Sequence, residues 1–294
     1  MAIVVSTLSL TSVPGQNGGG SYALMSTWEA AEQTDLVADG DSHVLECYND
    51  WPAGLDDSVL IADWVTGASN DITVRAATGE GHNGIEGAGF FLSHSNDNTI
   101  DIATSYVNLQ NLEIVHTSPT ANRALIVNAA IMGVIERCIF TSKTSNSECV
   151  LLNEIIEEGI FRNSLLFGSS ATNFNSTCRI NGSLIVMSNV TVIGGGGNSQ
   201  RGFAGNSSDS TLTNCIAFNN GNNDYEGLAG TTFINCASED NTASGTGAIT
   251  GVVEGDFKDF AGGDYTPSVG GVLENAGVDL SGDFTDDITG FTRG

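Results

Sequence analysis

The side chains most able to do acid–base chemistry in this sequence are carboxylates, and their spacing decides whether they can act together. Adjacent pairs include Asp56 and Asp57, Glu157 and Glu158, and Asp286 and Asp287. Carboxylates that face one sugar bond can hydrolyse it, and a calcium-binding cluster beside an Arg or Lys can act as a polysaccharide lyase. The first pair has no basic residue nearer in sequence than Arg75, and the third lacks EF-hand spacing. We therefore expect the third pair to be a solvated acidic turn rather than a cation site.

Histidine, cysteine and serine could supply metal-binding or nucleophilic chemistry, but their arrangement favours neither. The histidines are scattered, and the cysteines form no CxxC pair and have no paired histidine: His43, His82, His94, His116, Cys47, Cys138, Cys149, Cys178, Cys215 and Cys236. The phrase GNSSDS lacks the strand-to-helix setting of a nucleophile elbow, and no lysine follows the glycines of IGGGGNSQRG as a phosphate loop requires. The sequence therefore predicts no catalytic residue, no metal site and no cofactor, with an enzyme kept as the alternative.

The charge of the chain limits its partners. It carries 35 acidic and 9 basic side chains, a formal net charge of -26, and its only lysines are Lys143 and Lys258. Such a surface repels nucleic-acid phosphates and anionic membranes, so neither is expected to be a partner. Two explanations of the acidity stay open, namely solubility in salty water and complementarity to a basic docking surface. Because no basic residue precedes the N-terminal apolar run, we expect synthesis and folding in the cytoplasm, with reduced thiols.

The middle of the chain repeats one short pattern at intervals in the twenties. In each repeat a polar residue stands between two short groups of apolar residues. These polar residues are Asn111, Arg137, Asn163, Asn189, Asn214 and Asn235, at intervals of 26, 26, 26, 25 and 21. A second column precedes these anchors at Asn128, Asn153, Asn181 and Asn206, with intervals of 25, 28 and 25. Such a period is expected of a solenoid, in which each repeat buries its apolar face only against its neighbours. Apolar residues alternate around each anchor, which predicts two strand segments joined by a bend.

Asparagine suits a repeated bend for two reasons. It tolerates the left-handed backbone region, and its amide can both donate to and accept from the copies above and below. Stacked coils would place these amides about 4.8 Å apart, which is the spacing of neighbouring strands. We therefore expect both asparagine columns to form structural ladders, against the alternative that they are ordinary turn residues.

This pattern resembles the right-handed parallel β-helix family, the architecture of pectate lyases and of many tailed-phage surface proteins. The resemblance covers about residues 40–255 and implies an all-β, right-handed solenoid. The helical spacing of Ala23, Leu24, Trp28 and Ala31 predicts a short helix that caps the first coil. The polar end, with its ENAG and DITG phrases, resembles the irregular closing segment of such chains. We thus divide the chain into an N-terminal arm and cap (1–39), the β-helix (40–255) and a C-terminal cap (256–294).

The apolar residues 2–13 of the arm, which precede a glycine-rich stretch, leave two alternatives open. The arm could add a strand to the sheet of a partner. It could equally fold back as the first strand of its own cap.

The resemblance also sets the expected function. The phrase STWEAAEQTDLV followed by ECYND resembles the opening of phage β-helix proteins, and a chain that is nearly all β-helix suits a decoration or cement protein. We therefore expect a non-enzymatic virion protein, made in the host cytoplasm, that binds a major capsid or tail protein. Phage β-helices are commonly trimers, so the resemblance implies a homotrimer. The alternative is a tailspike-like polysaccharide lyase or glycoside hydrolase that acts on a surface polysaccharide.

Overall fold

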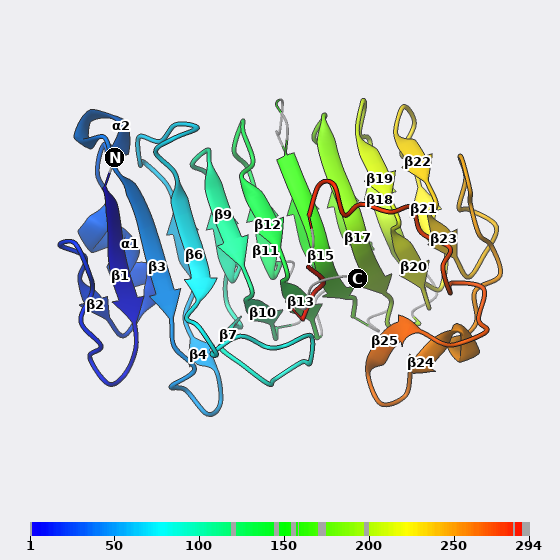
Figure 1. The fold of residues 1–294 in the computed structure, drawn as a ribbon, viewed down its shortest axis with the longest axis horizontal. Coiled ribbons are helices and arrows are strands. Elements are labelled where there is room, and N and C mark those ends of the chain that lie inside the picture. The colour runs from blue at the N-terminus through cyan, green and yellow to red at the C-terminus, as the bar shows by residue number, and fades with distance from the viewer. Residues whose placement is uncertain are drawn as a thin grey trace.

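Parallel strands dominate the computed structural model, which describes residues 2–118, 122–143, 147–153, 157, 159–169, 175–196, 200–284 and 286–289. Two sheets hold most of the strands, and every pairing between their named strands is parallel. Neighbouring strands come from segments one repeat apart in the chain, so the molecule is a row of stacked coils (Figure 1). The prediction of an all-β chain is confirmed, and the arrangement is consistent with a solenoid.

The larger sheet has 16 strands and consists of two strips that meet along a line of bends. The first strip contains β1 (Ile3–Leu8), β3 (Ser42–Cys47), β6 (Ile72–Ala76), β9 (Val107–Gln110), β12 (Val134–Glu136), β19 (Thr211–Thr213) and β22 (Thr232–Ile234). The second contains β4 (Leu55–Asp56), β7 (Phe91–His94), β10 (Glu113–His116), β13 (Ile139–Ser142), β20 (Ile216–Phe218) and β23 (Ala237–Ser238). The long strands β15 (Gly159–Phe167) and β17 (Ile185–Ile193) run through the bend and belong to both strips.

The smaller sheet has seven strands and closes the remaining side of the coils. Its members are β5 (Val59–Ile61), β8 (Ile100–Ile102), β11 (Leu125–Val127), β14 (Val150–Leu152), β16 (Ser176–Ile180), β18 (Arg201–Gly205) and β21 (Tyr225–Glu226). From β3 to β21, each coil therefore contributes one strand segment to each of three faces.

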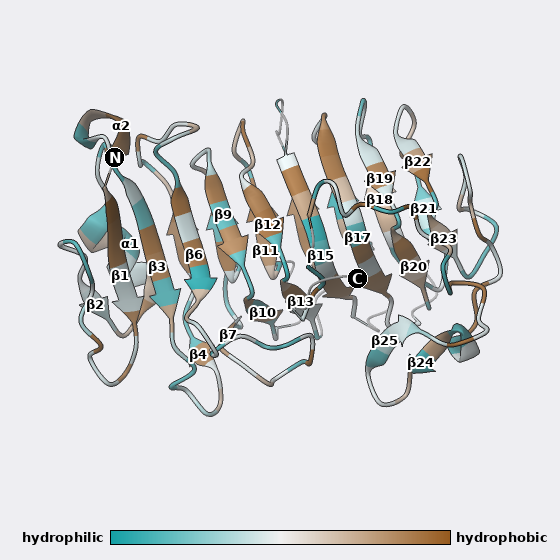
Figure 2. Ribbon diagram, in the orientation of Figure 1, coloured by the Kyte–Doolittle hydropathy of each residue, from teal (hydrophilic) through white to brown (hydrophobic). Residues whose placement is uncertain are grey.

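Columns of apolar side chains fill the space between the sheets. On successive strands Leu109, Ile135, Phe161, Met187 and Leu212 face one another, and all five are fully buried. Figure 2 shows apolar residues as brown bands that recur across the strands of the first strip. Burying one such side chain contributes about 1.5–3 kcal/mol, and each is buried only by the coils before and after its own.

The N-terminal stretch is part of the coil sheet. β1 pairs in parallel with β3 along its whole length, and β2 (Ser21–Tyr22) pairs with its end. This corresponds to the second alternative for residues 2–13, a strand of the chain's own fold.

A short helix, α1 (Met25–Glu32), follows β2 and buries Met25 and Trp28. The carboxylate of Asp57 accepts hydrogen bonds from the backbone N–H and the hydroxyl of Ser26, each at 2.9 Å. A carboxylate at this end of a helix satisfies an otherwise unpaired N–H and favours the helix dipole. One turn of helix, α2 (Leu36–Asp39), then leads into β3.

The C-terminal part packs on the outside of the coils. A 3-10 turn at Glu254–Asp256 leads into an antiparallel hairpin of β24 (Phe257–Asp259) and β25 (Asp264–Pro267). This hairpin covers the second strip through a separate hydrophobic cluster of Ile193, Phe218, Ala237, Val252, Phe257 and Leu273, with Phe167, Phe260 and Tyr265 packed against it. In Figure 1 the chain then turns back over the coils towards the middle of the molecule.

Candidate functional site: the bend row and its groove

The six anchor residues lie in one row where the two strips meet, and we call them the bend row. All six have a positive φ between 49° and 57°: Asn111, Arg137, Asn163, Asn189, Asn214 and Asn235. This left-handed conformation costs most residues roughly 1–2 kcal/mol, and asparagine is among the residues that tolerate it best. The repeated asparagine is therefore explained first by the backbone of the bend.

Amide side chains also link three neighbouring members of the bend row. Asn189 Nδ2 donates to Asn163 Oδ1 at 3.1 Å, and Asn214 Nδ2 donates to Asn189 Oδ1 at 3.0 Å. The position before Asn163 is Arg137, whose Nη1 lies 3.0 Å from Asp286 Oδ2 in an ion pair. The amide bonds thus join the three coils of Asn163, Asn189 and Asn214, and Arg137 interrupts the ladder before Asn163.

The second asparagine column is stacked in its backbone rather than in its side chains. The backbone N–H of each member donates to the carbonyl that precedes the matching position one coil earlier: Asn128 to Ile102, Asn153 to Val127, Asn181 to Leu152 and Asn206 to Ile180. Asn153 Nδ2 donates to Asn128 Oδ1 at 3.2 Å, but Asn181 accepts from Arg179 and Asn206 is exposed. The structure therefore brings only one pair of amides together in this column.

The chain's own C-terminal end lies along the bend row, and we call residues 275–284 and 286–289 the C-terminal strap. Three bend-row amides donate to strap carbonyls, namely Asn235 to Ala276 at 2.6 Å, Asn214 to Val278 at 3.0 Å and Asn163 to Asp286 at 3.0 Å. The N–H of Val278 returns a bond to Asn214 Oδ1 at 2.9 Å. The strap begins beside the coil of Asn235 and ends beside the earlier coil of Asn163, so it runs opposite to the order in which the coils are stacked.

A groove of about 1230 Å³ lies between the strap, the C-terminal hairpin and the coils. Its floor includes Leu165, Thr191 and Ile216, which face outward from the second strip, together with bend-row amides. Its opposite wall includes Tyr265 and Leu273. The groove is thus an elongated surface of apolar patches beside a row of hydrogen-bonding amides, the usual composition of a binding cleft.

A carboxylate with altered acidity lies on the same outward column, two coils before Leu165. Glu113 is only 2% exposed, and this burial is the main reason why its pKa is raised to about 7. The nearby charge of Glu86 raises the pKa further, while Lys143 opposes it. Glu113 Oε2 accepts a hydrogen bond from the N–H of Gly87 at 2.6 Å, which ties the preceding loop to β10. Nothing in the sequence pattern indicates this contact, because the loop with Glu86 and Gly87 belongs to the coil before that of Glu113.

This carboxyl should make the stability of the protein depend on pH near neutrality. A raised pKa favours the neutral form of Glu113 in the folded state, so its contribution is complete below about pH 4.5 and is lost as the pH rises through about 7. We expect Glu113→Gln to remove this loss. Between pH 5 and pH 8 the variant should gain about 1–3 kcal/mol in unfolding free energy relative to the wild type. Urea titrations at both pH values measure the change, and parallel wild-type and variant profiles would contradict it.

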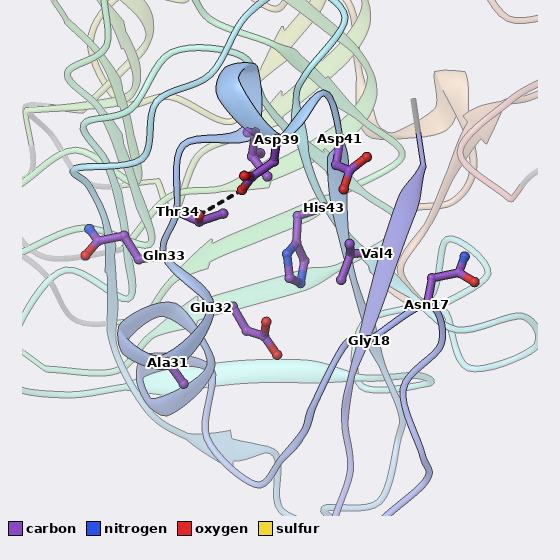
Figure 3. A pocket seen from close by; sticks show the side chains of 11 residues that line it. Val4, Asn17, Gly18, Ala31, Glu32, Gln33, Thr34, Asp39, Asp41 and His43 are labelled. Carbon is purple, nitrogen blue, oxygen red and sulfur yellow. Dashed lines mark hydrogen bonds between the residues drawn. The ribbon is translucent and has the colours of Figure 1, made fainter.

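A smaller pocket of about 370 Å³ lies at the N-terminal end, where Glu32 and His43 face each other (Figure 3). The Ser6 hydroxyl donates to Glu32 Oε1 and lies 3.0 Å from His43 Nε2. Trp28 Nε1 also donates to His43 Nε2, at 3.3 Å, so this nitrogen acts as an acceptor. These are the residue types of a serine hydrolase, but Ser6 is fully buried and the carboxylate binds the serine rather than the far side of the imidazole. The cluster therefore joins β1, α1 and β3.

The remaining acidic pairs have structural contacts or lie outside the described part of the chain. Asp56 Oδ1 lies 2.9 Å from His94 Nδ1, and Asp57 holds the start of α1. Glu157 is exposed, and Glu158 lies outside the described residues. At the other end of the chain, Asp287 accepts from the N–H of Thr289 at 2.8 Å. Among the described residues no group of three or more His, Cys, Asp or Glu side chains could hold a metal ion.

All six cysteines are buried free thiols. Burial raises the pKa of Cys138 to about 12, so this thiol is protonated at neutral pH. Cys215 and Cys236 occupy successive coils directly after their bend asparagines, and each donates a weak hydrogen bond to a main-chain carbonyl. The cysteines fill the core as small apolar side chains.

Of the helices that the structure describes, none has the length and apolar character needed to cross a membrane. No protein-family model matches this chain, and no curated protein matches it.

Proposed function

We propose that this protein is a non-enzymatic structural component of a tailed-phage virion, a capsid decoration or cement protein. In this proposal the stacked coils are a right-handed parallel β-helix, α1 caps the first coil, and residues 256–294 form the C-terminal cap. The protein assembles as a homotrimer, binds a major capsid or tail protein, and resides in the virion.

The observation that carries the proposal is the strap on the bend row. The corner between the two strips is a long outer surface on which stacked coils could hold an extended ligand. Here the chain's own backbone takes up three of the amides along that corner. The hairpin covers the neighbouring strip through its own hydrophobic cluster. An outer face used for internal bracing supports a mechanical role better than a catalytic one.

The distribution of charge supports a basic docking partner. Eight of the basic residues form ion pairs with carboxylates of the same chain: Arg75, Arg123, Arg137, Lys143, Arg162, Arg179, Arg201 and Lys258. Because these eight basic residues are already paired within the chain, they do not balance the excess carboxylates that give the formal net charge of -26. A partner with a basic surface would be attracted to such a protein over a long range at low salt.

The direct test is to look for the protein on particles. Phage particles purified from the lysate in which the protein is made are analysed by mass spectrometry and electron cryo-microscopy. The proposal predicts a fixed copy number and trimeric density on the capsid or tail. Its absence from purified particles would contradict the proposal.

One observation favours a second function, the cleavage of a surface polysaccharide. A glycosidase needs two carboxyls, one of which is protonated near neutral pH, and burial raises the pKa of Glu113 to about 7 with Glu86 nearby. Incubation with acidic and neutral polysaccharides, followed by assays for reducing ends and unsaturated sugars, separates the two functions. Products that disappear in Glu113→Gln would establish the enzyme, whereas a structural protein yields none.

A further inference from the structure

The bend row recognises the strap through main-chain atoms. The strap carbonyls of Ala276, Val278 and Asp286 accept from asparagine amides, and the N–H of Val278 donates to one. Such bonds depend on where the backbone lies and little on its side chains, as when a peptide adds to a sheet edge. The bend row therefore has the chemistry of a docking track for a polypeptide main chain.

The fit of the strap is close at one point and loose elsewhere. A Cβ atom at Gly277 would lie 3.1 Å from the side chain of Asn214, so the strap backbone passes directly over this amide. By contrast, half of the described strap residues are exposed, including Val278 at 39%, and Phe284 is the one described strap residue that is buried. The groove of about 1230 Å³ lies beside the strap. A segment with few buried apolar contacts opens locally at a lower free-energy cost than the whole fold.

Two contacts anchor the far end of the strap. Asp286 is paired with Arg137 at 3.0 Å, and the guanidinium of Arg162 lies 5.0 Å from the ring centre of Phe284. Both contacts use long, partly exposed side chains of the coils. They fix the direction of the strap, and Phe284 is buried at this end while most of its neighbours in the strap are not.

We infer that the bend row is an exchangeable docking track, on which the strap of a second copy of this chain can replace the chain's own strap. This inference depends on the observed contacts and is independent of the proposed function. The second copy is the occupant because it carries the same sequence in the same spacing, so every bond made within one chain can form between two. Among the connecting residues 268–274, Leu273 is held in the hydrophobic cluster, whereas Val269, which is 93% exposed, and Gly270 are exposed and provide a hinge. The intramolecular arrangement prevails in dilute solution, since tethering gives the chain's own strap a high effective concentration.

The test uses the full chain with a protease site inserted between Val269 and Gly270. Cleavage removes the tether but leaves every strap contact in place. A fluorescent synthetic peptide with the sequence of residues 270–294 is then added, and its binding is followed by anisotropy. We expect the peptide to displace the cut segment from the nicked protein. In the intact chain the tethered strap competes with the peptide, so the peptide should bind at least about 100-fold more weakly than it binds the nicked protein.

Two modified peptides test the track without altering the protein. N-methylation at Val278 removes the donor to Asn214 and should weaken binding about tenfold. N-methylation at Gly282, outside the bonds described above, is the matched control and should leave affinity nearly unchanged. The inference is overturned if the cut segment stays bound without exchanging until the coils unfold. It is also overturned if the peptide fails to bind after the segment has left, or if both modified peptides bind alike.

Discussion

Replacing Asn163 with alanine is expected to lower the free energy of unfolding by about 2–4 kcal/mol. Two effects add at this position. Alanine is strained at the observed φ of 49°, and the substitution removes the amide that donates to Asp286 and accepts from Asn189. The side chain is only 2% exposed, so water cannot readily take its place as a hydrogen-bond partner of the groups that it leaves unpaired. Urea denaturation followed by circular dichroism measures the change.

Two further variants separate these effects. Asn163→Gly relieves the backbone strain and keeps the loss of the amide, so it should cost about half as much. Asn153→Ala is the matched control from the second column, where φ is not positive and one amide pair is lost, and it should cost about 1 kcal/mol or less. Equal losses in Asn163→Ala and Asn153→Ala would show that the bend row has no special role.

Phe218→Ala should destabilise the protein by about 3–5 kcal/mol and release the C-terminal hairpin. Phe218 is 3% exposed, and its ring centre lies 5.2 Å from that of Phe257 and 5.0 Å from that of Phe260. It thus joins the second strip to the hairpin, and its removal leaves a cavity between them. Hydrogen exchange should show that β24 and β25 lose protection before the strands of the smaller sheet do.

The control for this variant keeps most of the volume. Phe218→Leu should cost about 1 kcal/mol and leave the hairpin protected. If β24 and β25 keep wild-type protection in Phe218→Ala, other contacts hold the hairpin, and the hydrophobic cluster around Phe218 does not fasten it to the coils.

The repeated parts of the fold could be predicted because each coil meets the same surroundings. Leu109, Ile135 and Phe161 recur at equal intervals since each occupies the same inward position on successive strands. The bend residues recur for a backbone reason, which is why Arg137 can replace asparagine there and still keep φ at 53°. The amide ladder is a weaker constraint, because it depends on neighbours that must also be asparagine.

The second column shows where the same argument fails. Asn128, Asn153, Asn181 and Asn206 recur at a suitable period, yet their backbone does not require asparagine. Their N–H groups pair along the sheet as those of any residue would, and the amides are free to find other partners such as Arg179. Periodicity alone therefore did not distinguish a ladder from a row of turn residues.

The groups that occur once could not be predicted from the repeat. Glu32 and Ser6 meet His43 only because α1 folds over β1, and the strap meets Asn163 across 123 positions of sequence. The raised pKa of Glu113 likewise comes from burial beneath a loop that belongs to an earlier coil. Such contacts depend on how single segments return to the coils, and no spacing in the sequence records them.

The stacking of successive coils is the central claim, and distances between spin labels test it most directly. Cysteines introduced at Thr73 and Thr211, or at Thr73 and Thr232, lie on one outward column separated by five or six strand spacings. The native thiols are buried and should stay unlabelled. Double electron–electron resonance should give backbone separations near 24 Å and 29 Å, a difference of about 4.8 Å for one coil. Separations that do not grow by this increment would contradict the stacked arrangement and everything argued from it.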